Sequence, residues 1–147
     1  MANLIFQTAC GVVGLLLRLT VAVVIFPHGA QKLFGWFGGY GPAPTLQFFK
    51  SLGIPTALGW LGILTESVGS VLLVLGLGTR VVALLLAGVM VSAALLVHKD
   101  VGFFMNWGGQ HQPGREGFEY HILALGTLAA LLVTGGGTWS LDALLAR

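Results

Sequence analysis

The first long apolar stretch of the chain, residues 8–26, contains a single charged residue, Arg18. The stretch is long enough to cross the ~30 Å hydrocarbon layer of a membrane as a helix, because each helical residue rises by about 1.5 Å. An arginine near the centre of such a span costs about 3 kcal/mol or more. We therefore expect the fold to give Arg18 a partner inside the membrane.

The composition supports a membrane location for the whole chain. Of its 147 residues, 56% are hydrophobic and 8% are charged, and the mean hydropathy is +0.91. Soluble domains carry about 25% charged residues, so we predict an integral membrane protein. The chain has no basic cluster, and we expect no nucleic-acid partner. Its one cysteine, Cys10, excludes an intramolecular disulfide and a CxxC redox pair.

Four apolar segments have the length of membrane spans, or nearly so. Their approximate bounds are residues 8–26, 57–77, 81–98 and 118–134. A non-helical backbone in lipid would leave amide groups unsatisfied, so we expect four helices. The residues before the first segment carry no basic charge, and we expect that segment to be kept as a span. The predicted fold is all-α: a four-transmembrane-helix bundle, formed by residues 1–147 as one domain.

Two long connections, residues 35–55 and 99–117, separate these segments. With four spans, both connections lie on one side of the membrane, and the two termini and the turn at residues 78–80 lie on the other. Within the first connection, TLQFFKSL places apolar residues on one face and predicts a short helix at the membrane interface. The few Lys and Arg residues do not determine which side faces the cytoplasm.

Counting along the helices suggests a partner for Arg18. Arg18 lies ten residues before His28, and Glu66 lies ten residues after Thr56, so both are roughly 15 Å from the long connections. Each charge also falls on a face rich in small residues, where another helix can approach closely. We predict a buried Arg18–Glu66 ion pair. It would serve either as a structural clamp or as part of a binding site.

Further polar residues gather at the ends of the spans next to the long connections. His28 and Lys32 are four residues apart and share a helix face, His98 ends the third span, and residues 119–121 begin the fourth. These positions predict a polar funnel that leads down to Arg18 and Glu66. The candidate ligand-binding residues are Arg18, His28, Lys32, Glu66, His98, Glu119, Tyr120 and His121.

The residues of the funnel favour one kind of ligand. A quinone has carbonyl oxygens that accept hydrogen bonds from His, Tyr, Lys or Arg, and its ring and tail need apolar walls. A b-type haem held by His28 with His98 or His121 is less favoured, and a small anion drawn to Arg18 and Lys32 is another alternative. No zinc, EF-hand, P-loop or dinucleotide-binding spacing is present, so we predict no metal.

Several blocks of the sequence resemble the DoxX family of small four-helix membrane proteins. The blocks are RLTVAVVIFPHGAQKLFGWFGGYG, FFKSLGIP, LLVLGLGTR, GFFMNW, EGFEYHILAL and GGGTWSLD. Together with the Glu66 segment they cover nearly the whole chain. The resemblance implies that recurrent family positions are occupied by Arg18, His28, Gly29, Lys32, Glu66, Glu119, Tyr120, His121 and Asp142.

The resemblance implies a subunit of a membrane oxidoreductase assembly, in several relatives linked to quinones. We therefore expect a quinone-linked oxidoreductase component in a bacterial-type cytoplasmic (inner) membrane. It would work with redox partner proteins and would form a homo-oligomer, and its catalytic residues are unassigned. The alternative is a non-enzymatic protein for binding or transport, or a scaffold for a partner complex. The thiol chemistry of some relatives needs a cysteine pair, which this chain lacks.

Overall fold

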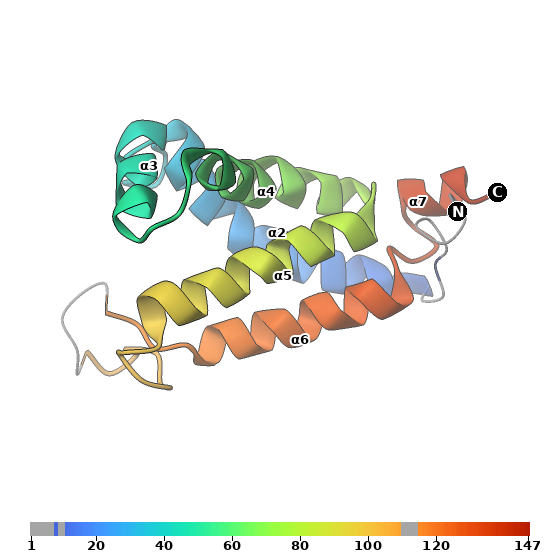
Figure 1. Ribbon diagram of the computed structural model, residues 1–147. Helices are drawn as coiled ribbons and strands as arrows, with labels where there is room; N and C mark the ends of the chain where they lie inside the picture. Colours follow the sequence, from blue (N-terminus) through green and yellow to red (C-terminus); the bar gives the residue numbers. More distant parts are fainter. Residues whose placement is uncertain (1–7, 9–10, 110–114) are drawn as a thin grey trace.

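The computed structural model describes Thr8, residues 11–109 and residues 115–147. Within this part of the chain the regular structure is entirely helical, as predicted (Figure 1). The helices are α2 (Gly11–Phe34), α3 (Pro42–Ser51), α4 (Thr56–Leu75), α5 (Thr79–Ala93), the π-helical turn η1 (Ala94–His98), α6 (Glu119–Thr134) and α7 (Leu141–Leu145).

Three helical segments are long and apolar enough to cross a membrane: α2, α4, and α5 together with η1. The fourth apolar helix, α6, has 16 residues. The outward faces of these helices are apolar; Val23 is 70% exposed, Leu84 62% and Val133 76%. Such surfaces are stable against lipid and would be unfavourable in water. The chain is therefore a helical membrane bundle.

The bundle consists of two closely packed helix pairs. Helix α2 runs along α4, and α5 runs along α6, with α4 and α5 joined by a short turn (Figure 1). The interior is filled by aliphatic side chains from all four helices. These residues are Val21, Ala22, Ile25, Leu73, Val82, Ala83, Leu86, Met90, Ala124, Leu128 and Leu131.

The arrangement of the connections follows the prediction. Helix α3 and the described parts of the connection between η1 and α6, residues 99–109 and 115–118, lie at one end of the bundle, and the α4–α5 turn and α7 lie at the other (Figure 1). Helix α3 is the short helix expected in the first connection. Helix α2 is longer than the predicted span, because it continues through Pro27 to Phe34.

One close contact sets the register between α2 and α4. Gly29 of α2 lies against the backbone of Glu66 and Ser67, and a Cβ atom at this position would stand 2.6 Å from the Ser67 Cα. Only glycine allows the two helix backbones to approach this closely. Residue 29 is therefore level with residues 66 and 67, which decides which polar groups of the two helices can meet.

Candidate functional site

Arg18 is not paired with Glu66, so this prediction is wrong. The fully buried guanidinium of Arg18 donates hydrogen bonds to four backbone carbonyls instead. Two of them, at 2.6 and 2.8 Å, belong to Leu73 and Val74 near the end of α4. The other two, at 2.9 and 2.6 Å, belong to Gly136 and Trp139 in the segment that follows α6. Arg18 thus joins α2, α4 and the C-terminal segment.

Helix register explains the error. The sequence count took His28 as the end of the first helix, but α2 continues to Phe34. With Gly29 level with Glu66, Arg18 lies eleven residues away, roughly 16 Å along the helix. At that depth it meets the carbonyl end of α4. The last carbonyls of a helix have no partners within the helix and carry partial negative charge, so they suit a guanidinium.

Asp142 has the complementary role on the other side of the α4–α5 turn. Its carboxylate is 1% exposed and accepts hydrogen bonds from the backbone N–H groups of Gly78 (2.6 Å) and Thr79 (2.9 Å). These N–H groups form the amino end of α5, where a negative charge is favourable. Asp142 also attracts Arg18 electrostatically. The two charges are therefore a structural clamp at the end of the bundle away from the long connections.

Lys32 is the residue that pairs with Glu66. The Lys32 Nζ and Glu66 Oε2 form an ion pair between α2 and α4, in which the side chains are 27% and 4% exposed respectively. Lys32 lies about one helical turn beyond Gly29, so the same register that separates Arg18 from Glu66 brings Lys32 to it. A buried carboxylate needs such a partner, because an unpaired charge in an apolar interior is costly.

The predicted cluster of histidines forms near this ion pair. The rings of His98 and His121 contact each other, with centroids 4.5 Å apart and planes inclined at 43°. Tyr120 packs edge-on against His121, and His28 interacts electrostatically with Lys32 and Glu66. The Nδ1 of His121 is buried and has no hydrogen-bond partner among the described residues. Six of the eight candidate residues therefore lie in one region around the Lys32–Glu66 ion pair. The two exceptions are Arg18 and Glu119.

Glu119 is occupied by the loop that precedes it. Its Oε1 accepts hydrogen bonds from the Met105 backbone N–H (2.9 Å) and the Trp107 indole N–H (3.1 Å). The neighbouring Glu116 carboxylate accepts one from the Asn106 N–H at 2.6 Å. These carboxylates fix the aromatic loop at residues 103–107 over the start of α6. Glu119 is thus a loop anchor, a role that the sequence did not indicate.

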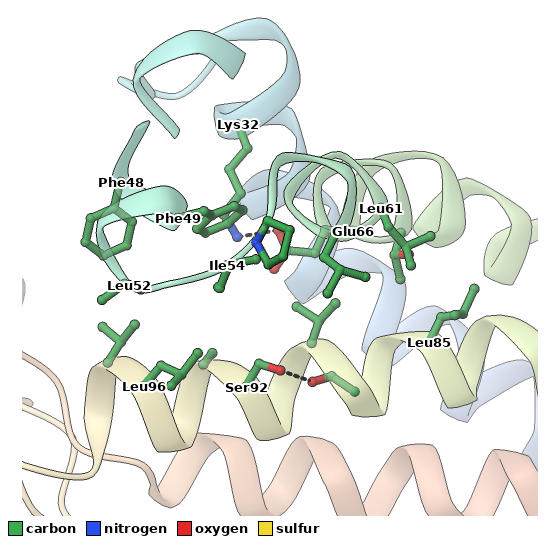
Figure 2. Close-up of a pocket in the computed structure, with 18 of the residues that line it drawn as sticks. Lys32, Phe48, Phe49, Leu52, Ile54, Leu61, Glu66, Leu85, Ser92 and Leu96 are labelled. Carbon is green, nitrogen blue, oxygen red and sulfur yellow. Dashed lines mark hydrogen bonds and ion pairs between the residues drawn. The ribbon is translucent and has the colours of Figure 1, made fainter. Parts of the chain in front are cut away.

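A pocket of about 720 Å³ opens between α4 and α5, next to the ion pair (Figure 2). Three of the candidate residues, Lys32, Glu66 and His98, supply its charged and titratable groups. Most of its remaining walls are apolar. They include Phe48, Phe49, Leu52 and Ile54 from α3 and the segment after it, Leu58 and Leu61 from α4, and Leu84, Leu85, Leu96 and Val97 from α5 and η1.

Two glycines leave room for the pocket. Gly62 of α4 and Gly88 of α5 both line it, and a Cβ atom at either position would meet nothing within 4 Å. Gly62 lies four residues before Glu66, on the small-residue face for which the sequence predicts close helix packing and no cavity. The sequence does contain a sign of the cavity, because these two glycines lie near the middle of neighbouring spans. The same residue type can mark close packing or empty space, and only the register separates the two cases.

The pocket opens on the outer flank of the bundle. Leu61, Leu84 and Leu85 belong to its walls and are also exposed on the faces of α4 and α5 that meet lipid. The predicted funnel pointed down the bundle axis from the long connections, whereas the observed pocket faces sideways. Among the described residues, no three His, Cys, Asp or Glu side chains are arranged to hold a metal ion.

Sequence comparisons place the chain among membrane proteins. The family model described as DoxX matches residues 13–99. The chain belongs to the DoxX family. It is 33% identical over 128 residues to "Putative oxidoreductase CatD" of Bacillus subtilis (strain 168), covering 87% of this chain and 83% of that protein. No solved structure matches the chain.

Two relatives from Escherichia coli (strain K12) are named by location alone. The inner membrane protein YphA is 27% identical over 139 residues, which is 93% of either chain. The inner membrane protein YqjF is 28% identical over 131 residues, 89% of this chain and 90% of its own. The DoxX match includes Lys32, Glu66 and His98, the three charged or titratable residues of the pocket.

Proposed function

We propose that this DoxX protein binds a membrane-soluble quinone in the pocket between α4 and α5 and acts as a component of an oxidoreductase. The observation that carries the proposal is the position of the Lys32–Glu66 ion pair and His98 on a mostly apolar pocket open to lipid. A quinone has the same division into a polar head and an apolar tail. The Bacillus relative is named an oxidoreductase, which supports redox chemistry in this proposal.

The size and shape of the pocket agree with such a ligand. Ligand sites typically have volumes of about 300–1,000 Å³, with mostly apolar walls and a few polar groups that fix orientation. Lys32 can donate a hydrogen bond to a head-group oxygen while it stays close to Glu66. A tail can leave between Leu61 and Leu85, both on the lipid-facing flank, so the ligand would not have to pass through water.

We also propose a bacterial cytoplasmic (inner) membrane as the location, because two relatives are named inner membrane proteins. Partner proteins would supply or remove electrons, since no redox centre is evident in the sequence. A non-enzymatic binding or transport protein would use the same pocket. The redox state of the bound quinone, measured in membranes that contain the partner proteins, distinguishes an oxidoreductase component from such a non-enzymatic protein. It changes in the first case and stays constant in the second.

The test is quinone binding by the purified protein in lipid nanodiscs. We expect decyl-tailed ubiquinone or menaquinone analogues to bind the wild type, and Gly62→Leu and Gly88→Leu to weaken this binding by about tenfold or more, because a leucine fills the pocket. Gly126→Leu is the matched control, since Gly126 also lies on a helix beside open space but lines no part of this pocket. Binding that is absent in the wild type, or equal in all four proteins, would refute the proposal.

A further inference from the structure

We infer that the pocket selects the reduced, hydroxyl-bearing form of its ligand, the quinol, through the Nε2 atom of His98. This inference rests on the proposed quinone site and adds to it a preference for one redox form. Quinone oxygens can only accept hydrogen bonds, whereas quinol hydroxyls can also donate them. The Lys32 ammonium in the pocket can donate to either form, because quinol oxygens also accept hydrogen bonds. A preference for the quinol therefore depends on whether the pocket also offers acceptors.

The hydrogen bonding of His98 fixes its tautomer. Its Nδ1 lies 2.7 Å from the backbone carbonyl oxygen of Glu116. A carbonyl oxygen can only accept, so Nδ1 must carry the proton. In the neutral ring Nε2 then has a free lone pair, and it makes no hydrogen bond with the described residues. His98 thus offers an acceptor to a ligand in the pocket that it lines.

Glu66 adds a second acceptor. Its Oε2 is bound by Lys32, and its Oε1 makes no hydrogen bond with any other described residue. The carboxylate forms an ion pair with the Lys32 ammonium, and a carboxylate in an ion pair is only an acceptor. A quinol can donate to both Glu66 and His98, while a quinone can use neither. A quinone oxygen placed beside either group would leave a lone pair facing another lone pair.

The backbone geometry at His98 also supports a functional role for this side chain. Helix α5 changes from α-helical to π-helical geometry at Ala94–His98, directly before the connection to α6. Single π-helical turns are rare and occur often at functional sites. Here the turn contributes Leu96, Val97 and His98 to the pocket wall. On its other side, the His98 ring rests on His121 of α6, which limits its rotation.

The experiment compares the affinities of decylubiquinol and decylubiquinone for the protein in anaerobic nanodiscs. We expect the wild type to bind the quinol at least about tenfold more tightly than the quinone. His98→Asn keeps an amide donor near the Nδ1 position, and so the bond to Glu116, but has no acceptor at the Nε2 position. This variant should lose about tenfold in quinol affinity while its quinone affinity stays within about twofold.

His98→Gln is the companion variant, because its amide oxygen can reach the Nε2 position and should retain part of the preference. Thermal unfolding of each variant checks that the bundle is intact. Equal wild-type affinities, a preference for the quinone, or an equal loss of both ligands in His98→Asn would overturn the inference and leave the quinone site in place. If neither ligand binds the wild type, the proposed function fails and the inference fails with it.

Discussion

Arg18 and Asp142 neutralise the two helix ends that meet at the α4–α5 turn. Arg18 donates to the last carbonyls of α4, and Asp142 accepts from the first N–H groups of α5. Each charge thus complements the dipole of the helix that it caps. The turn between them requires Gly76 and Gly78, whose φ angles are +68° and +62°. The clamp joins residues far apart in the sequence, so it stabilises the tertiary fold.

Removal of Arg18 should therefore destabilise the bundle. We expect Arg18→Met to lower the free energy of unfolding by about 3–5 kcal/mol, because it leaves four buried or partly buried carbonyls and the Asp142 carboxylate without their cation. Arg18→Lys should also be destabilising, since an ammonium has fewer donors than a guanidinium. Denaturation in mixed detergent micelles measures the effect.

Lys50→Met is the control for this series, because Lys50 is exposed on α3 and its replacement should change stability by no more than about 0.5 kcal/mol. An Arg18→Met protein as stable as the control would contradict the clamp. A folded Arg18 variant that still binds quinone would show that Arg18 acts on the structure and not at the pocket.

The Lys32–Glu66 ion pair should show strong energetic coupling. Lys32→Met leaves the carboxylate of Glu66, which is 4% exposed, without a partner, and we expect a loss of about 3 kcal/mol in stability. Adding Glu66→Gln should recover part of that loss, with a coupling free energy of about 1–3 kcal/mol. A double-mutant cycle in the same unfolding assay measures the coupling. Additive effects would mean that the two side chains do not interact in the membrane.

Gly29 should tolerate no side chain. We expect Gly29→Ala to destabilise the protein by about 1–3 kcal/mol, because its Cβ would meet the backbone of Ser67 and Glu66, which cannot move aside as a flexible side chain can. Gly126→Ala has open space at its Cβ and should be neutral or slightly stabilising. Comparison of the two melting temperatures tests the register of α2 and α4 directly. Equal melting temperatures would argue against the close contact.

Haem titration separates the quinone site from the haem alternative. In the haem alternative His28 is one axial ligand and His98 or His121 is the other. The rings of His98 and His121 contact each other with centroids 4.5 Å apart, so a haem bound to either ring would have to displace the other. We expect the purified protein to show no Soret band of a six-coordinate b-type haem after incubation with haemin. A Soret band in the wild type that disappears in His98→Phe would contradict this expectation and favour the haem alternative.

The membrane bundle follows from the sequence alone. The lengths and hydropathy of the apolar segments were sufficient, because a chain in lipid must satisfy its backbone within helices. The same counting placed α3 in the first connection and both long connections at one end. It also brought Lys32, His28, His98 and residues 120–121 to the same level. Span ends carry polar groups, and antiparallel helices bring those ends together.

Which charges meet depends on how the helices pack against one another. The axial register of α2 against α4 depends on the contact of Gly29 with Ser67 and not on the distance of each charge from a predicted helix end. This register pairs Glu66 with Lys32 and moves Arg18 to the carbonyls of α4. A buried guanidinium needs hydrogen-bond acceptors, and backbone carbonyls at a helix end meet that need as well as a carboxylate does. No pattern of side chains in the sequence reveals them.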